Sequence, residues 1–336
     1  MSLFKKVACF TDIHFGLKSN SATHNQDCED FVDWFIAEAK KEGCDTGIFL
    51  GDWHHNRNSL NMLTMVSSVK ALEKLGQAFE HFYFFPGNHD LYYKDKRDVH
   101  SVDWGRHIPG VTIVNEITTI GDTTMVPWLI GEEWKKMEKL TSRYVFGHFE
   151  LPLFMMNAMV QMPDHGELQA SNFKNPEYVC SGHFHKRQAK QNIVYIGNAF
   201  PHNYADAWDD DRGMMILEHG GKPQYKVWPD APKFKTVKLS QLIDEGDNLI
   251  KSKTYLRVGI DIDISYEEAS YIKETFLANS NLRELTLIPE KKEVEINNDI
   301  DVEHFESVDQ IVSNQIANIQ SDNYDSKVLL AIYNNL

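Results

Sequence analysis

The stretch KVACFTDIHFG, residues 6–16, decides the fold of this chain. Its apolar run from Lys6 to Thr11 predicts a buried strand, and the strand leads into Asp12 and His14, two residue types that bind metal ions. In an extended segment, residues two apart lie on one side, so this carboxylate and this imidazole can bind the same ion. A single pair of this kind is more often a solvated turn after a strand.

Four further apolar runs end in the same way, with GD at 51–52, GNHD at 87–90, GH at 147–148 and GHFH at 182–185. Because ligands collect at the carboxyl ends of the strands in an open α/β sheet, five such ends predict one site and an enzyme. The candidate ligands are Asp12, His14, Asp52, Asn88, His148, His183 and His185. Seven ligands are about the right number for two metal ions that are bridged by one shared ligand, here the Asp52 carboxylate. Such a set leaves coordination positions open for water and substrate.

His89 follows a candidate ligand directly, and a side chain beside a ligand in a turn usually points elsewhere. This makes His89 a candidate general acid, with Asp90 or another carboxylate holding its second ring nitrogen. The alternative is that His89 only shapes the turn through a hydrogen bond.

Helices and strands alternate over the first ninety residues, which predicts βαβ units and a parallel start to the sheet. The expected strands span 6–11, 46–50 and 81–85, and the helices 27–42 and about 60–78. Short strands then follow at 111–114, 117–120, 124–129, 144–146, 178–181 and 194–196, which predict a mixed sheet or two packed sheets. Residues 153–162, with four methionines, favour a helix packed on the core over a mobile wall beside the site.

Composition changes after about residue 230. We expect a main domain over 1–230, a small α/β domain over 231–290, an acidic linker over 291–302 and a helical element over 303–336. In the small domain, strands are expected at 255–264 and 283–288, with a capping box at Ser265 and Glu268 that opens a helix. The helical element carries apolar residues at helical spacing: Phe305, Val308, Val312, Ile316, Ile319, Leu329, Ile332 and Leu336.

The net charge is −15, which at first argues against a nucleic-acid partner. Residues 241–336 hold 8 Lys or Arg and 19 Asp or Glu, so −11 lies there and only −4 on residues 1–240. Two divalent ions would offset that remainder and attract phosphate. A stretch of roughly 18 to 20 apolar residues is absent from the sequence, and we expect no membrane association, a cytoplasmic protein, and reduced cysteines.

The motifs DIHFG, GD, PGNHD, GHFE and SGHFH together resemble the signature of calcineurin-like metallophosphoesterases. The chain is most similar to their double-strand-break-repair nuclease branch, the SbcD-type subunits, which includes recombination nucleases of T-even-like bacteriophages. The resemblance implies a two-sheet αββα core with a small α/β capping domain and C-terminal helices. It also implies two divalent ions, most often Mn²⁺, with Mg²⁺ as the alternative.

The resemblance further implies the role of each site residue. One ion would be held by Asp12, His14, Asp52 and His185, and the other by Asp52, Asn88, His148 and His183. His89 would be the catalytic histidine. The auxiliary histidine of the family corresponds to His55, but His54 beside it leaves that assignment open.

The function implied is a DNA nuclease, an exonuclease with endonuclease capability, that hydrolyses phosphodiester bonds by a two-metal mechanism. It would act on double-stranded ends or single strands as a homodimer within a heterotetramer with an SMC-like ATPase, in recombination and double-strand-break repair. The helical element would bind the ATPase, and residues 60–78 and 98–107 would form the dimer. If the chain is viral, it would act in the host cytoplasm.

A few basic residues flank the expected site: Lys94, Lys96, Arg97, Lys186 and Arg187. Such clusters are usually solvated surface, so we expect weak DNA binding without a partner. The alternative function is a phosphatase or cyclic-nucleotide phosphodiesterase on a small substrate. A catalytically silent scaffold is disfavoured because all seven candidate ligands and His89 are present.

Overall fold

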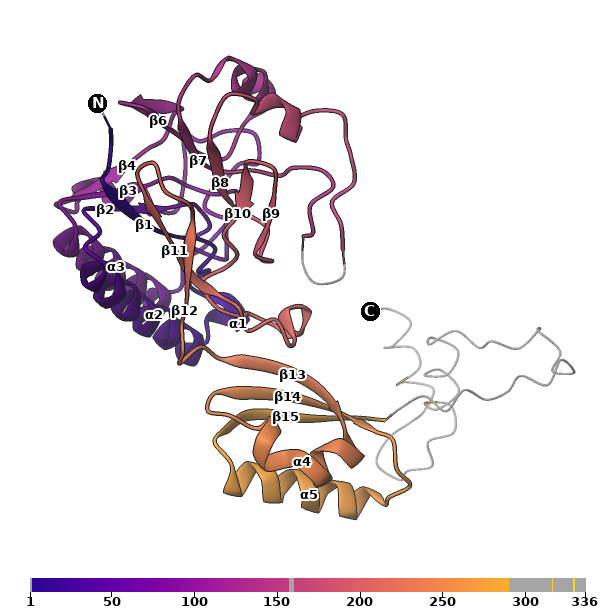
Figure 1. Cartoon of the computed structure of the whole chain (residues 1–336). Helices are drawn as coiled ribbons and strands as arrows, with labels where there is room; N and C mark the ends of the chain where they lie inside the picture. The colour runs from indigo at the N-terminus through magenta and orange to yellow at the C-terminus, as the bar shows by residue number, and fades with distance from the viewer. Residues whose placement is uncertain (1, 157–159, 290–315, 317–328, 330–336) are drawn as a thin grey trace, which may run out of the picture. The chain divides into compact units, whose positions relative to one another are not determined.

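The computed structural model describes residues 2–156, 160–289, 316 and 329. The described helices are α1 (Leu17–Asn20), α2 (Ala22–Lys41), α3 (Met62–Ala78), α4 (Leu239–Leu249) and α5 (Tyr266–Asn279). Short 3₁₀ helices are η1 (Asp103–His107), η2 (Gly131–Lys139), η3 (Ala170–Asn172) and η4 (Tyr204–Asp206). Figure 1 labels the five α-helices along the coloured chain.

The first sheet has the strand order β12-β11-β1-β2-β3-β4. Its parallel strands are β1 (Lys6–Phe10), β2 (Thr46–Phe49), β3 (His81–Phe84) and β4 (Val111–Ile113). The hairpin of β11 (Gly213–Glu218) and β12 (Gln224–Val227) joins this sheet with β11 antiparallel to β1. The predicted parallel start of the sheet is therefore confirmed, whereas the hairpin was not predicted.

The second sheet has the order β5-β6-β7-β8-β10-β9. Its inner strands are parallel: β6 (Thr123–Val126), β7 (Tyr144–His148), β8 (Tyr178–Gly182) and β10 (Ile193–Tyr195). The edge strands β5 (Thr118–Ile120) and β9 (Gln188–Lys190) pair antiparallel with their neighbours.

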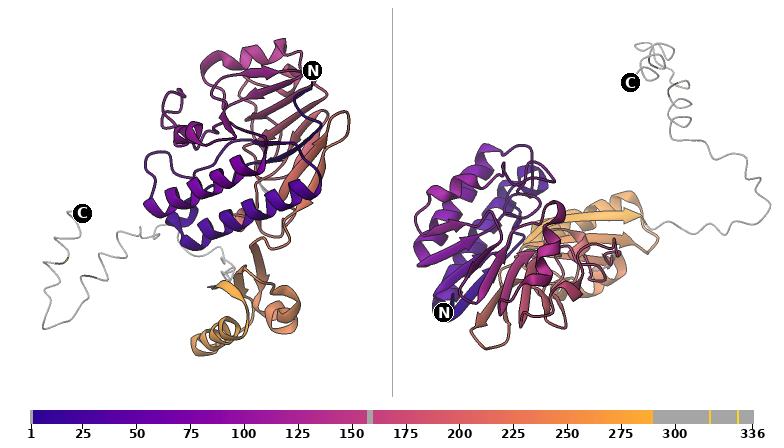
Figure 2. Two further views of the ribbon diagram at one scale, coloured as in Figure 1. Left: turned by 90° about the vertical axis from the view of Figure 1, so that its left-hand side faces the viewer. Right: turned by 90° about the horizontal axis from the view of Figure 1, so that it is seen from above.

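The two sheets pack face to face around a buried apolar layer. Side chains of the first sheet, such as Ile48 and Phe85, share one cluster with Phe146 and Cys180 of the second. On the outer face of the first sheet, α2 and α3 lie side by side, as Figure 2 shows. The outer face of the second sheet is covered by loops and η2, with Met137 buried. The predicted two-sheet α/β core is confirmed.

Helix α2 shows how the local sequence builds this layer. The Ser21 hydroxyl accepts a hydrogen bond from the His24 N–H at 3.3 Å and caps the helix, which therefore begins earlier than the predicted residue 27. Phe31 and Phe35, one turn apart, are fully buried against the first sheet. Burial of two phenylalanine side chains contributes several kcal/mol, roughly 1.5–3 each.

The expected helix over residues 153–162 is wrong in the described part of that segment. Residues 153–156 and 160–162 instead pair like a hairpin, with Leu153 N–H donating to the Met162 carbonyl at 2.9 Å and Met162 N–H to the Phe154 carbonyl at 2.8 Å. Phe154 and Met162 are buried beneath this loop. Anchoring of these two side chains in the core outweighed the helical spacing of the methionines.

A third, parallel sheet is formed by β13 (Lys233–Lys238), β14 (Thr254–Ile260) and β15 (Leu282–Pro289), with α4 and α5 packed on it. The capping box of α5 is present, because Ser265 and Glu268 exchange hydrogen bonds at 2.8 and 3.2 Å. Neither β13 nor α4 was predicted. β15 also contacts α2, since the Arg283 guanidinium binds the Asp27 carboxylate through two bonds of 2.6 and 2.8 Å.

The expected linker and C-terminal helical element lie outside the described residues, apart from isolated Ile316 and Leu329. In the described ranges, every helix is too short or too polar to cross a bilayer. Cys9, Cys28, Cys44 and Cys180 are free thiols, and burial raises the pKa of Cys180 to about 12, as expected for a core thiol.

Candidate metal centre

The predicted ligands gather where strands of both large sheets end. Asp12 follows β1, Asp52 follows β2 and Asn88 follows β3, while His148 ends β7 and His183 follows β8. Neighbouring ends are joined through the backbone. The Asp12 N–H donates to the Gly51 carbonyl at 3.0 Å, and the His14 N–H donates to the Asp52 carbonyl at 3.2 Å.

A first set of donor atoms comes from Asp12, His14 and His185. The Asp12 Oδ1 atom lies 3.9 Å from His14 Nε2 and 4.0 Å from His185 Nε2. His14 Nε2 also lies 3.7 Å from Asp52 Oδ2. Atoms spaced in this way can share one ion at metal–ligand distances of about 2.1 Å.

A second set comes from Asp52, His148 and His183. His148 Nε2 lies 3.4 Å from Asp52 Oδ2 and 3.1 Å from Asn88 Oδ1, and His183 Nδ1 lies 3.0 Å from the same Asn88 oxygen. The Asp52 carboxylate thus lies within 4 Å of ring nitrogens from both sets. Its two oxygens are therefore in a position to bridge two ions.

A further observation indicates that these residues fit divalent cations. Asp12 Oδ1 and both ring nitrogens of His14 are buried and lack a hydrogen-bond partner among the described residues. Burial of unpaired polar atoms costs free energy, and native proteins rarely tolerate it without a ligand. His148 Nδ1 donates to the Leu50 carbonyl at 2.7 Å, so Nε2 is the ring nitrogen that faces the other donor atoms.

Charge in the centre is balanced within the second donor set. Burial works against the charged form of His148, but the Asp52 carboxylate outweighs it and raises the pKa of His148 to about 9. Burial likewise opposes ionisation of Asp52, yet His148 holds the pKa of that carboxyl well below its usual range. Bound cations would supply the same kind of positive charge to this buried carboxylate.

Four of the seven expected ligands adopt a left-handed backbone, which is uncommon outside glycine. The φ angles are 50° at Asp12, 53° at His14, 63° at Asp52 and 85° at His183. Residues held in such conformations cluster at functional sites, where surrounding hydrogen bonds enforce them.

The strand ends approach each other so closely that glycine is required at two positions, Gly87 and Gly182. A Cβ at Gly87 would lie 2.2 Å from Asp52 Oδ1, and a Cβ at Gly182 would lie 2.1 Å from the Thr11 hydroxyl oxygen. Any side chain there would push the Asp52 loop or the β1 end away from the centre.

Asp90 does not hold the second ring nitrogen of His89, contrary to our expectation. Its buried carboxylate instead accepts hydrogen bonds of 2.9–3.2 Å from the backbone N–H groups of Asp52, Trp53, His54 and Gly87. Burial raises the pKa of Asp90 to about 6, against the effect of these bonds. Asp90 therefore positions the Asp52 loop. The His89 ring is held by the His55 carbonyl oxygen, 2.9 Å from Nδ1.

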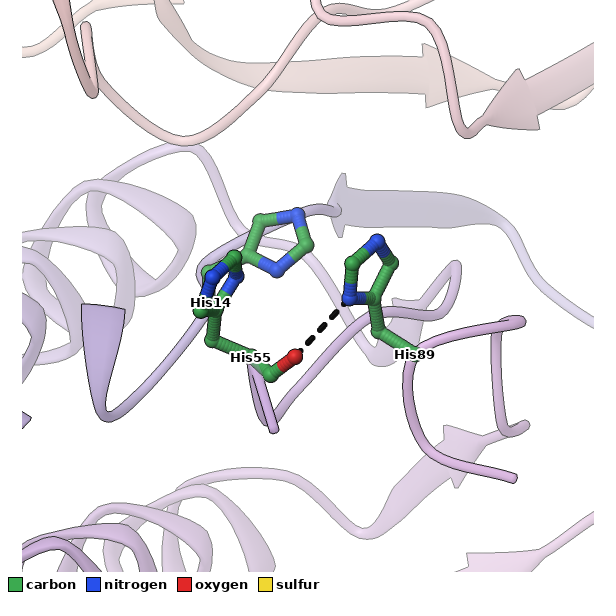
Figure 3. A group of neighbouring side chains, drawn as sticks. All are labelled: His14, His55 and His89. Atoms are coloured by element: carbon green, nitrogen blue, oxygen red, sulfur yellow. Dashed lines mark hydrogen bonds between the residues drawn. The ribbon is translucent and has the colours of Figure 1, made fainter. Parts of the chain in front are cut away.

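Figure 3 shows His55 beside His14 and His89. The His55 ring stacks on the His89 ring at 5.4 Å and lies edge-on to His14 at the same distance. His54 points away and is buried between the Ser68 and Ser101 hydroxyls, at 3.0 and 2.7 Å. Burial lowers the pKa of His54 to about 3. Of the two histidines, the geometry brings His55 to the centre.

Sequence reasoning missed two buried histidines behind the first donor set. His202 Nε2 bonds to the Asp12 carbonyl at 2.8 Å, and His24 Nε2 bonds to the His14 carbonyl at 3.0 Å. The two rings lie 5.6 Å apart. They support the backbone of the Asp12–His14 segment. Neither lies in a spaced motif, so only the fold reveals them.

Two of the flanking basic residues are not free to bind phosphate. Arg97 is buried and forms a two-bond ion pair of 2.6 and 2.8 Å with Glu133. Arg187 lies over the Tyr225 ring at 4.4 Å and pairs with Asp211 at 3.6 Å. Lys94 and Lys96 are exposed. Fewer basic side chains beside the site are therefore available to bind phosphate than the sequence indicated.

Two packed sheets with a two-cluster donor set at their strand ends define the class of protein. A family model described as calcineurin-like phosphoesterase matches residues 5–187, more than half of the chain, so the chain belongs to this family. The family resemblance seen in the motifs is confirmed.

Among named relatives, exonuclease subunit 1 of Enterobacteria phage T4 is 27% identical over 222 residues. The alignment covers 63% of this chain and 64% of the relative, just under two thirds of its length. Solved structures that resemble this one include TT1561 of Thermus thermophilus, with a TM-score of 0.40, 10% identity and coverage of 67% of this chain and 99% of that one. Another is the E. coli phosphoesterase Yfce, with a TM-score of 0.31, 12% identity and coverage of 63% and 88%.

Proposed function

We propose that the chain is a metal-dependent DNA nuclease, an exonuclease with endonuclease capability, that hydrolyses phosphodiester bonds at DNA ends. The observation that carries this proposal is the pair of donor sets on either side of Asp52, with His89 adjacent to them. Two ions about 3.5–4 Å apart are the arrangement used for in-line displacement at phosphorus. The name of the phage T4 relative, exonuclease subunit 1, supports a nucleic acid as the substrate.

In the proposed centre, Asp12, His14, Asp52 and His185 hold one ion, and Asp52, Asn88, His148 and His183 hold the other. When bound, two divalent ions supply activated water and neutralise charge on the phosphoryl oxygens. Imidazole nitrogens mixed with carboxylate and amide oxygens favour Mn²⁺, with Mg²⁺ as the alternative.

His89 is the proposed proton donor to the departing sugar oxygen. Its Nδ1–H donates to the His55 carbonyl, so Nε2 is the ring atom left to exchange a proton. The backbone N–H of His89 donates to Asp52 Oδ1 at 2.8 Å, which fixes the histidine relative to the bridging carboxylate. His55 is the proposed auxiliary histidine because its ring stacks on that of His89.

The third sheet is the proposed DNA-positioning cap over residues 231–290. Its link to the core includes the Asp27–Arg283 ion pair and Lys253, whose Nζ lies 2.6 Å from Asp230 and 3.5 Å from Asp27. A small substrate has no need of such a platform, whereas a DNA duplex extends well beyond the metal centre. The cap therefore supports a nuclease over a phosphatase or a cyclic-nucleotide phosphodiesterase.

The proposed complex is a heterotetramer of two copies of this chain with two copies of an SMC-like ATPase, acting in recombination and double-strand-break repair. Support for a homodimer comes from the N-terminal end of α3, where Met62 is 84% exposed and Leu63 and Val66 are each 49% exposed. Exposed apolar side chains that lie next to one another on a helix are typical of a surface that binds another protein. Residues 303–336 are the proposed ATPase-binding element.

The function is tested with Mn²⁺-dependent cleavage of end-labelled linear duplex DNA beside a small phosphodiester, with and without a candidate ATPase. We expect metal-dependent shortening of the DNA, stimulated by the ATPase, with a steep loss of activity as salt rises. Turnover of only the small substrate would assign the chain to the phosphatase or cyclic-nucleotide phosphodiesterase alternative.

The assembly is tested by two variants. Met62→Glu should shift the protein from dimer to monomer in analytical ultracentrifugation, with Met155→Glu, distant from α3 in sequence, as the matched control. Deletion of residues 300–336 should abolish ATPase association and leave metal-dependent cleavage by the isolated chain intact. A dimeric Met62→Glu protein, or undiminished ATPase binding by the deletion, would contradict the corresponding assignment.

A further inference from the structure

An aromatic pocket opens beside the second donor set. It has a volume of about 160 Å³ and is lined by Trp128, Trp134, Phe149, Met162 and the metal-centre residue His148. The Trp128 ring centroid lies 5.0 Å from that of His183 and 5.9 Å from that of His148. The pocket is therefore continuous with the place where a scissile phosphate would bind.

The volume of the pocket suits one planar ring system. A cavity of about 150 Å³ is known to accept benzene, so a pocket of about 160 Å³ has room for an aromatic ring. Indole side chains stack on every nucleobase, because each base has a π-face. Two indole side chains, Trp134 and Trp128, line the pocket wall.

Among the described residues, the pocket lining offers a phosphate neither a guanidinium nor an ammonium group. The carboxylates of Glu150 and Glu167 line it together with the imidazoles of His148 and His165. Carboxylates repel a phosphate and accept hydrogen bonds from the exocyclic amino groups of bases. The pocket is therefore better suited to an uncharged group that follows the phosphate on the same strand than to the phosphate itself.

The pocket wall is held in place before any ligand arrives. Trp134 lies on η2, next to Glu133, whose carboxylate is fixed by the buried Arg97. Arg97 also donates to the Trp128 carbonyl at 2.7 Å, so one guanidinium ties both tryptophan segments together. Preorganised contacts of this kind reduce the entropy lost on binding.

We infer that this pocket binds one unstacked nucleobase of the strand being cleaved, from the nucleotide adjoining the scissile phosphate. The inference rests on the proposed nuclease function. A base enters the pocket only after leaving the helical stack, which costs a few kcal/mol in a paired duplex and less at a frayed or mismatched end. Single strands and mismatched ends are therefore better substrates than fully paired ends.

The pocket is tested with Trp134→Ala, because Trp134 lies outside the donor sets. Trp208, which is 51% exposed and lies outside the pocket lining, provides the matched control Trp208→Ala. The substrates are single-stranded oligonucleotides cleaved in the presence of Mn²⁺, either normal or with a tetrahydrofuran abasic nucleotide on one or the other side of the scissile phosphate.

For the normal oligonucleotide we expect Trp134→Ala to raise KM about tenfold, the size of one base–aromatic stack, with kcat little changed. With one of the two abasic oligonucleotides, the unaltered protein should show a KM about tenfold higher than with the normal oligonucleotide. On that same abasic oligonucleotide, Trp134→Ala should have the same KM as the unaltered protein. Equal losses on normal and abasic DNA, or no loss on either, would overturn the inference.

A second readout separates this inference from the proposed function. Fluorescence anisotropy in EDTA measures the Kd of the same oligonucleotides without cleavage, and the same non-additivity between Trp134→Ala and the abasic nucleotide is expected there. Absence of cleavage with this pattern of binding would refute the nuclease and retain the pocket. Cleavage without this pattern would refute the pocket and retain the nuclease.

Discussion

The imidazole of His89 is fixed by its neighbour in space, since Nδ1 lies 2.9 Å from the carbonyl oxygen of His55. A backbone carbonyl accepts only, so Nδ1 keeps its proton, and as a general acid His89 would carry the proton that it transfers on Nε2. The sequence suggested a carboxylate in this role. The structure assigns the role to the main chain of the Asp52 loop.

His89→Asn should keep both ions and lose cleavage. An asparagine amide can still donate to the His55 carbonyl, but it cannot transfer a proton, and general acid catalysis contributes about 100-fold to 10,000-fold. Elemental analysis of the purified protein and cleavage of end-labelled DNA measure the two properties. His81→Asn, at an exposed histidine at the start of β3, is the matched control. Nuclease activity retained by His89→Asn would remove His89 from the mechanism.

Asp52→Asn should reduce the content of both ions, not of one. The Asp52 carboxylate approaches ring nitrogens of both donor sets, and a neutral amide of the same shape cannot bridge two cations. The measurement is the number of Mn²⁺ ions bound per chain after dialysis. Asp33→Asn on α2, where Asp33 pairs only at the surface with Lys74, should leave the ion count unchanged. Loss of a single ion from Asp52→Asn would show that the carboxylate is not shared.

Glu133→Gln should destabilise the protein in a pH-dependent way. Burial opposes ionisation of Glu133, but the Arg97 hydrogen bonds outweigh it and the pKa of Glu133 lies below its ordinary value of 4.5. At pH values between the folded and unfolded pKa of Glu133, the unfolded chain binds more protons than the folded chain. The ionised Glu133 carboxylate therefore stabilises the fold fully above about pH 4.5, and this stabilisation is lost as the pH falls through the folded pKa. Removing one partner of a largely buried pair costs about 3 kcal/mol.

Urea unfolding in EDTA measures this change in the free energy of unfolding. The difference between the unaltered protein and Glu133→Gln should be full at about pH 7 and should shrink below pH 4.5. Glu132→Gln changes the exposed neighbouring carboxylate and should have little effect. A difference independent of pH would show that the carboxylate charge does not stabilise η2.

Arg283→Gln should impair cleavage of duplex DNA more than that of a small phosphodiester. Asp27 is buried on α2, and its two bonds to Arg283 help to attach the third sheet to the core. If that sheet positions DNA, small misplacements can cost about tenfold to 100-fold in rate, while the metal centre itself is untouched. The ratio of the two rates is the measurement, with Lys273→Gln on α5 as control. An equal loss on both substrates would argue against a positioning cap.

Much of the first sheet and the metal ligands could be predicted because their signals are local. Asp12 and Asp52 closely follow apolar strands and His148 ends one, so these ligands are recognisable from a few residues. Element boundaries shifted where capping decided them, as at Ser21 before α2. The methionine segment misled because its helical spacing was overridden by burial of Phe154 and Met162.

Other features depend on contacts between residues far apart in the chain. Arg97 looked like a surface cation, and only its buried pairing with Glu133 shows that it is structural. His54 and His55 are adjacent in sequence and equivalent by composition. The path of the backbone after Asp52 sends one ring into the core and the other to the metal centre.

The sequence by itself determined which chemistry is present: seven metal-binding side chains at strand ends, one spare histidine and the family to which the chain belongs. These follow from hydrophobic periodicity and short motifs, which act over a few residues. The tertiary structure alone decided that a backbone carbonyl holds His89 and that two tryptophans form a pocket beside His148. Those relationships depend on packing of two sheets against each other, and no local pattern encodes the resulting distances.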